Sequence, residues 1–161
     1  MNIVILADSF PPYICGVTTH TVELSRALIR RGHRLLIFAP KYPNPPDLPP
    51  EFKKARVVYV TSVPTHFPNL RVNLPSFPKI RAEIKSFNPS IIYAQAPTIT
   101  SIEAQQYARI RSIPFVGSFH TLYASDAYLK IIFKTEYATM FQPLIWSILR
   151  WFYNASDRII V

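Results

Sequence analysis

Short apolar runs alternate with amphipathic segments from the first residues onward, and this alternation most constrains the fold. Ile3–Ala7 (IVILA) and Leu35–Ala39 (LLIFA) are continuous apolar runs, typical of strands buried on both faces. Between them, apolar residues recur at helical spacing from Val22 to Ile29, followed by two arginines and by Gly32, a suitable helix end. A strand–helix–strand unit this short requires parallel strands joined by a right-handed crossover.

The same alternation continues along the rest of the chain. Further strands are predicted at Arg56–Thr61, Ser90–Ala94, Pro114–Phe119 and Asp157–Val161. Helices are predicted at Pro78–Phe87, Ile99–Arg111 and Tyr123–Asn154, the last with a break at Pro143. Loops are predicted at Lys41–Lys54 and Ser62–Pro75. We therefore predict an α/β fold: a doubly wound, Rossmann-like parallel sheet of about six strands with helices on both faces.

Charge and composition narrow the class of partner. The 161 residues suit one domain, and a formal charge of +9 favours nucleic acid, an anionic membrane surface or phosphorylated small molecules. Basic residues cluster only in pairs, and no motif of a known nucleic-acid reader is present, so nucleic acid ranks last. We expect a cytoplasmic protein, because the chain has neither a signal-peptide start nor an apolar run long enough to span a bilayer.

Metal and dinucleotide chemistry find no support in the sequence. Cys15 is the single cysteine and the four histidines are scattered without a metal-binding motif, so no metal site is expected. A nicotinamide fold would need three spaced glycines after the first strand and an acidic residue after the second. Here the first loop has one glycine, and the second strand ends in Phe38-Ala39-Pro40.

The loop before the first helix is the first candidate site, because ligands of such sheets bind at the carboxyl ends of the strands. Gly16 is one of only three glycines in the chain. It could let the backbone approach an anion, with free amides near Thr18 and Thr19 donating to it. It could equally be a turn glycine beside a threonine N-cap.

Other polar residues stand at the same edge of the predicted sheet. His120 follows the fifth strand and could donate to a bound oxygen, or be satisfied by backbone. Asp8 could hold a ligand hydroxyl or cap its own loop, and Gln95 could face a ligand or be a buried amide. We interpret Cys15 as a small packing residue and His20 as a structural or loop contact.

The segment 123–154 mixes cations with apolar and aromatic residues. Lys130, Lys134 and Arg150 alternate with Trp146, Trp151 and many aliphatic side chains. This pattern fits a helix pair packed on the sheet, and it also fits a segment lying on a membrane or lining a lipid groove.

Together these stretches resemble a known enzyme family. Residues 1–40, "MNIVILADSFPPYICGVTTHTVELSRALIRRGHRLLIFAP", resemble the opening of family-4 retaining glycosyltransferases of GT-B fold. Residues 88–121, "NPSIIYAQAPTITSIEAQQYARIRSIPFVGSFHT", resemble the family's fourth-to-fifth-strand unit, including its aromatic-His-Thr ending. Residues 128–161, "YLKIIF…WSILRWFYNASDRIIV", resemble the helix and strand that follow.

The resemblance implies that residues 1–161 form the N-terminal, acceptor-side domain of a GT-B glycosyltransferase of hexosyltransferase type. In that family a UDP- or GDP-linked sugar lies between two domains and is transferred with retention, without metal or separate cofactor. Its diphosphate would be bound at Cys15, Gly16 and Val17. His120 would contact the transferred sugar as the catalytic residue.

The acceptor, a sugar or a lipid-linked compound, would be bound by Asp8, Tyr13, Thr121 and Tyr123. The family often has glycine where this chain has Cys15, and histidine where it has Gln95.

The C-terminal donor-binding domain, with its paired glutamates, is absent from this sequence, so we expect little transfer from the chain by itself. The alternatives are a non-catalytic module docking on a membrane or partner, and a nucleotide-sugar epimerase relative.

Overall fold

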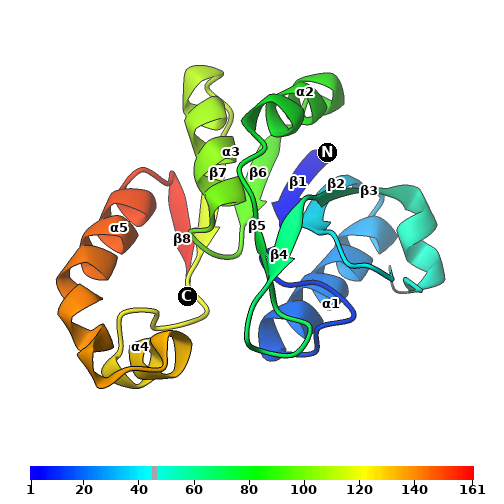
Figure 1. The fold of residues 1–161 in the computed structure, drawn as a ribbon. Helices are drawn as coiled ribbons and strands as arrows, with labels where there is room; N and C mark the ends of the chain where they lie inside the picture. The colour runs from blue at the N-terminus through cyan, green and yellow to red at the C-terminus, as the bar shows by residue number, and fades with distance from the viewer. Residues whose placement is uncertain (45–46) are drawn as a thin grey trace.

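The computed structural model describes residues 1–44 and 47–161, and its centre is a six-stranded parallel sheet (Figure 1). The sheet order is β3-β2-β1-β6-β7-β8. Its strands are β1 (Asn2–Leu6), β2 (Arg34–Pro40), β3 (Ala55–Val60), β6 (Ile91–Ala94), β7 (Phe115–Ser118) and β8 (Arg158–Ile160). All six predicted strands are confirmed to within one residue at each end. The apolar runs identify them because strands covered on both faces have no solvent face.

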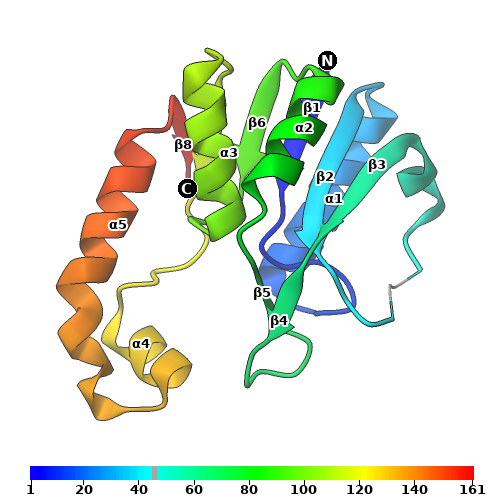
Figure 2. The same cartoon turned by 45° about the horizontal axis from the view of Figure 1, so that its top comes forward.

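Helices cover both faces of this sheet, as the doubly wound prediction requires. The helices are α1 (Gly16–Arg30), α2 (Phe77–Phe87), α3 (Ile99–Ile110), α4 (Asp126–Phe133) and α5 (Gln142–Asn154), with 3-10 turns η1 (Pro50–Lys54) and η2 (Glu136–Phe141). The core on one face joins β1 and β2 to α1 and η1. The core on the other face joins the sheet to α2, α3 and the end of α5. The segment from α4 to α5 lies beside β8, at one end of the sheet (Figures 1 and 2).

Two predicted segments differ from the structure. The predicted helix 123–154 is divided into α4, η2 and α5, and Pro143 lies in the first turn of α5. Lys134, with a left-handed φ of 52°, caps the end of α4. Proline at a helix start loses no hydrogen bond, so the break predicted at Pro143 falls before that residue.

The predicted loop 62–75 instead contains an antiparallel hairpin of β4 (Ser62–Pro64) and β5 (Arg71–Asn73). The Arg71 guanidinium donates to Ser62 Oγ at 2.8 Å and to the Ser62 carbonyl at 2.7 Å, a cross-strand contact that hydropathy does not reveal. In the predicted loop 41–54, η1 forms near the end, and residues 45 and 46 lie outside the described residues.

Two glycines have specific structural roles. Gly32 follows the α1 C-cap and has φ +79°, a conformation that side chains disfavour, so the predicted helix end is confirmed. Gly117 in β7 lies under α5. A Cβ there would stand 3.1 Å from Ser156 Oγ and 3.2 Å from the Tyr153 ring, so α5 packs closely only because the position lacks a side chain.

We expect Gly117→Ala to lower the free energy of unfolding by about 1–3 kcal/mol, because the added methyl group must displace Tyr153 or the end of α5. Urea denaturation measures the change. Gly16→Ala is the matched control, since its Cβ would meet nothing within 4 Å. Equal stability of the two variants would contradict the packing role of Gly117.

Candidate functional site

The sheet order reverses at β1, and this reversal positions the candidate site. β1 pairs with β2 on one side and with β6 on the other, both in parallel. The chain leaves the carboxyl ends of β1 and β6 in different directions, which opens a crevice at that edge. Asp8 follows β1, Gln95 follows β6 and His120 follows β7, so the fold brings the predicted residues to one edge.

The N-terminus of α1 differs from the prediction in its cap. Cys15, rather than Thr18 or Thr19, is the N-cap, and its Sγ accepts the Thr18 amide at 3.4 Å. The Thr19 amide donates to the Cys15 carbonyl at 3.0 Å. Both threonine amides are therefore occupied, because the helix begins at Gly16, three residues earlier than a Thr18 cap would allow.

The amides that remain open are those of Gly16 and Val17. Among the hydrogen bonds of residues 1–44 and 47–161, neither amide donates to a protein group. Gly16 is exposed and the space beside it is empty. Two open amides at the start of a 15-residue helix, whose dipole favours negative charge there, form an anion-binding geometry.

A histidine pair stands next to this helix end. The rings of His20 in α1 and His120 are 4.8 Å apart between centroids. The Tyr93 hydroxyl, from β6, lies 3.3 Å from His20 Nε2 and 3.4 Å from His120 Nε2. Ser118 Oγ lies 2.8 Å from the same His120 nitrogen. Burial, and secondarily the charge of His20, lower the pKa of His120 and favour its neutral form.

Asp8 is the acidic group of the site. Its Oδ1 is buried without a hydrogen-bond partner among the described residues. Burial raises its pKa from 3.8 to about 6, although the backbone amides of Asp8 and Ser9 oppose the shift. A carboxyl group held in this way can accept a hydrogen bond from a ligand hydroxyl near neutral pH.

The other predicted acceptor residues lie near Asp8. Tyr13 is close enough to Cys15 and Asp8 for their charges to raise its pKa, after burial as the larger cause. Tyr123 packs edge-on against Tyr128, with ring centroids 5.3 Å apart, and its amide donates to the Thr121 carbonyl at 2.9 Å. Burial, followed by the Asp8 charge, raises the pKa of Tyr123.

A groove of about 600 Å³ opens beside Asp8, and we call it the carboxyl-edge groove. Asp8 and Tyr123 line it, whereas Tyr13 and Thr121 do not. Most of its wall is apolar and comes from the β4–β5 hairpin, the β6–α3 loop, α4 and α5, including Phe67, Leu70, Val72, Leu129, Ile145 and Leu149. The groove is thus an apolar channel with a buried carboxyl group among its lining.

Several residues of this edge were not identified from the sequence. Arg71 and Asn73 line the groove but belong to the hairpin, which was predicted as a loop. Asn73 Nδ2 donates to Thr100 Oγ1 at 3.0 Å, and its buried Oδ1 has no partner among the described residues. Tyr93 and Ser118 lie inside apolar strand runs. Their only signal was a polar group at the carboxyl end of a buried strand.

Gln95 is fully buried, as one of its two interpretations required. Neither its Nε2 nor its Oε1 has a hydrogen-bond partner among the described residues. Its backbone amide donates to the Leu6 carbonyl and extends the β1–β6 pairing.

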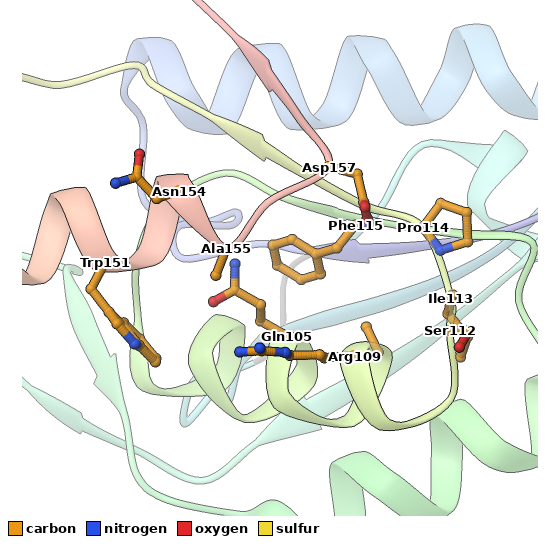
Figure 3. A pocket seen from close by; sticks show the side chains of 11 residues that line it. Gln105, Arg109, Ser112, Ile113, Pro114, Phe115, Trp151, Asn154, Ala155 and Asp157 are labelled. Atoms are coloured by element: carbon orange, nitrogen blue, oxygen red, sulfur yellow. Dashed lines mark hydrogen bonds between the residues drawn. The ribbon is translucent and has the colours of Figure 1, made fainter.

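A second cavity, of about 700 Å³, lies at the opposite, amino-end edge of the sheet between α3 and α5 (Figure 3). Gln105 and Arg109 reach into it from α3, and Trp151 comes from α5. None of the residues predicted for substrate binding lines this cavity.

The described residues contain no group of three or more His, Cys, Asp or Glu side chains arranged to hold a metal ion. Within the same part of the chain, no helix has the length and apolar character needed to cross a membrane.

Comparison with known proteins identifies the family. Residues 14–161 match Glycosyltransferase Family 4, and the chain belongs to this family. Sulfoquinovosyl transferase SQD2 of Arabidopsis thaliana is 27% identical over 150 residues, which are 92% of this chain and 28% of that protein. A GDP-mannose-dependent alpha-mannosyltransferase of Mycolicibacterium smegmatis is 30% identical over 125 residues, 75% of this chain and 32% of that protein.

The chain therefore spans about a third or less of these curated relatives. Among solved structures, Anabaena Alr3699/HepE in complex with UDP-glucose aligns with a TM-score of 0.47 and 15% identity, covering 82% of this chain and 34% of that chain. Family membership confirms the resemblance seen in the sequence. The roles assigned to individual residues stay predictions.

We expect Asp8→Asn to stabilise the chain by up to about 3 kcal/mol at about pH 8, because burial holds the pKa of Asp8 above its unfolded value. The raised pKa means that the folded state binds this proton more tightly. The cost of the ionised carboxylate is therefore absent below pH 3.8 and grows as pH rises to about 6.

Urea denaturation of both proteins across this pH range measures the effect. The stability difference should shrink as pH falls toward 3.8. A difference that does not vary with pH would contradict a buried, titrating Asp8.

Proposed function

We propose that this chain forms the acceptor-side part of a retaining glycosyltransferase of GT-B type. In this proposal a UDP- or GDP-linked sugar binds at the start of α1, and its sugar is transferred to an acceptor in the carboxyl-edge groove. A second α/β domain would hold the nucleotide and complete the cleft.

The observation that carries the proposal is the pair of open amides at Gly16 and Val17 beside His120. A glycosyl transfer from a nucleotide-sugar leaves a diphosphate whose negative charge grows as the bond to the sugar breaks. Fixed backbone donors and a helix N-terminus stabilise such charge without reorganising. The chain belongs to a family of glycosyltransferases, for which this chemistry is required.

His120 would act from the neighbouring strand end. Its Nε2 is engaged by Ser118 and Tyr93, whereas no hydrogen bond to Nδ1 is recorded among the described residues. A neutral imidazole with a free edge can donate to, or accept from, an oxygen of the transferred sugar. Its lowered pKa keeps it neutral in the absence of ligand.

The carboxyl-edge groove favours an amphiphilic acceptor, such as a lipid-linked sugar. Apolar walls bind a hydrocarbon portion, and Asp8 can accept a hydrogen bond from the hydroxyl that receives the sugar. Tyr123 lines the groove with Asp8, while Tyr13 lies near Asp8 and Thr121 contacts Tyr123; in this proposal the three would contact the polar part of the acceptor.

Gly16→Val should weaken binding of UDP and GDP at least fivefold without loss of stability. The larger side chain leaves the fold undisturbed, because the space beside Gly16 is open, but it hinders a diphosphate from reaching the amides. Isothermal titration calorimetry of the 161-residue chain measures both affinities.

Lys85→Ala is the control for general attraction of anions. Lys85 lies near the end of α2, where the chain returns to the amino end of β6, so its loss should leave the affinity unchanged. Equal binding by Gly16→Val and the native chain would contradict the assignment of the diphosphate to this loop.

We expect little or no sugar transfer from the 161-residue chain by itself. Half of the nucleotide site would belong to the second domain, so single-domain binding should be weak and the transition state poorly stabilised. An assay with UDP- and GDP-sugars, with and without a separately supplied donor domain, measures this dependence.

A membrane-docking role, alone or in addition to transfer, is favoured by one observation. Along α4, η2 and α5, large apolar side chains are exposed, among them Ile131, Tyr137, Met140, Leu144 and Trp151. Tyr137 and Met140 are 76% and 75% exposed. Exposed apolar side chains in a basic chain fit peripheral attachment to an anionic membrane surface on the cytoplasmic side.

A Met140→Glu, Leu144→Glu double variant tests this role. Co-sedimentation with phosphatidylglycerol vesicles should fall several-fold relative to the native chain, because two charges enter the apolar contact. Ile110→Glu, a change at a 73% exposed isoleucine of α3, is the matched control. Unchanged sedimentation of the double variant would exclude this segment as the contact.

A further inference from the structure

Four polar residues from different elements, His120 among them, form a network of side-chain contacts. His20 belongs to α1, Tyr93 to β6, and Ser118 to β7, with His120 two residues beyond Ser118. The contacts join His20 Nε2 to the Tyr93 hydroxyl at 3.3 Å and this hydroxyl to His120 Nε2 at 3.4 Å. Tyr93 is buried, so its hydroxyl has little access to water and depends on protein groups, these two histidines and Ser118, for hydrogen bonding.

His20 determines which atom donates in each hydrogen bond of this network. No hydrogen bond to His20 Nδ1 is present among the described residues, so no protein group at Nδ1 opposes the ordinary preference of a histidine for its proton on Nε2. Whether neutral in this form or charged, His20 then donates from Nε2 to the Tyr93 oxygen. The Tyr93 O–H is left to donate to His120 Nε2.

We propose that His20 is a positioning residue that, through Tyr93, makes His120 Nε2 a hydrogen-bond acceptor and so keeps the proton of His120 on Nδ1. Ser118 Oγ lies 2.8 Å from the same Nε2, and because a hydroxyl can donate or accept, this contact is compatible with either tautomer and leaves the choice to Tyr93. The tautomer of a histidine is set by the bond that its other nitrogen makes. His120 thereby presents an N–H donor on the nitrogen that the protein leaves free.

This donor is what the proposed function requires, and only the use of the donor rests on that function. An Nδ1–H directed at a sugar or phosphate oxygen can stabilise developing negative charge, whereas a bare nitrogen would repel it. The opposite tautomer would turn the same histidine into an acceptor.

The groups that face His120 come from several elements. His20 faces it from α1 and Tyr93 from β6, while the Tyr153 hydroxyl of α5 donates to the Ser118 carbonyl at 2.9 Å. The charge of Asp8 acts on both Tyr93 and Tyr153. The pKa of His120 is lowered first by burial and second by His20, so removing His20 should raise this pKa only in part.

Nitrogen-15 NMR of the imidazole rings in the 161-residue chain reads the tautomer directly and needs no nucleotide. In the native chain we expect His120 to be mainly Nδ1–H. Tyr93→Phe and His20→Leu should shift it toward Nε2–H. Tyr93→Phe removes the hydroxyl that donates to Nε2, and His20→Leu removes the imidazole that donates to this hydroxyl. His20→Gln should retain the Nδ1–H form, since a side-chain amide can replace the donor, and should raise the pKa of His120.

His33→Gln is the control and should leave His120 unchanged, because the His33 ring contacts the N-terminal amine, at the amino end of β1. If His20→Leu fails to fold, the nearly isosteric Tyr93→Phe makes the same test. A native His120 found mainly as Nε2–H, or a tautomer unaffected by Tyr93→Phe in a folded chain, would overturn the proposal. If His120 is Nδ1–H in a chain that binds neither UDP nor GDP, the positioning role of His20 stands and the proposed function alone is contradicted.

Discussion

The parallel pairing of β1 with β2 on one side and β6 on the other is the constraint on which the candidate site depends. Together with the pairing of β6 and β7, it places the first loop, the β6–α3 loop and the end of β7 at one edge of the sheet (Figure 1). The apolar runs favour this arrangement, because the central strands bury side chains on both faces and must therefore lie inside the sheet rather than at its edge. Asp8, the histidine pair and the open start of α1 therefore lie at the same edge of the sheet.

The residue at the N-cap of α1, a cysteine rather than a serine or aspartate, determines which amides are open at this edge of the sheet. With Cys15 as the N-cap, the sulfur accepts the third amide of the helix, and only the first two amides remain open. A sulfur is a weak acceptor, so this cap adds less stability than a serine or aspartate would. In return, the cap places no charge beside the open amides. An aspartate there would repel a diphosphate.

Strands were predicted well from the sequence where the side chains on both faces are buried. Ile3–Ala7 and Leu35–Ala39 are short and apolar throughout, which is typical of strands buried on both faces. The β4–β5 hairpin was missed because its strands are three residues long and its stability comes partly from the Arg71 contact with Ser62. The placement of the candidate residues at one edge of the sheet was predicted, but the contacts among them were not. Strand ends identified Asp8 and His120, whereas the Tyr93 bridge needs knowledge of which side chains face one another across three elements.

The central claim is that the amides of Gly16 and Val17 receive the diphosphate of a nucleotide-sugar. The most direct measurement is an amide NMR titration of the assigned chain with UDP and GDP, which follows every backbone N–H at once. The account predicts saturable shifts that are largest at Gly16 and Val17 and extend to His120. Shifts centred elsewhere, for example around Arg109 in the amino-end cavity, or no saturable shift at α1, would contradict it.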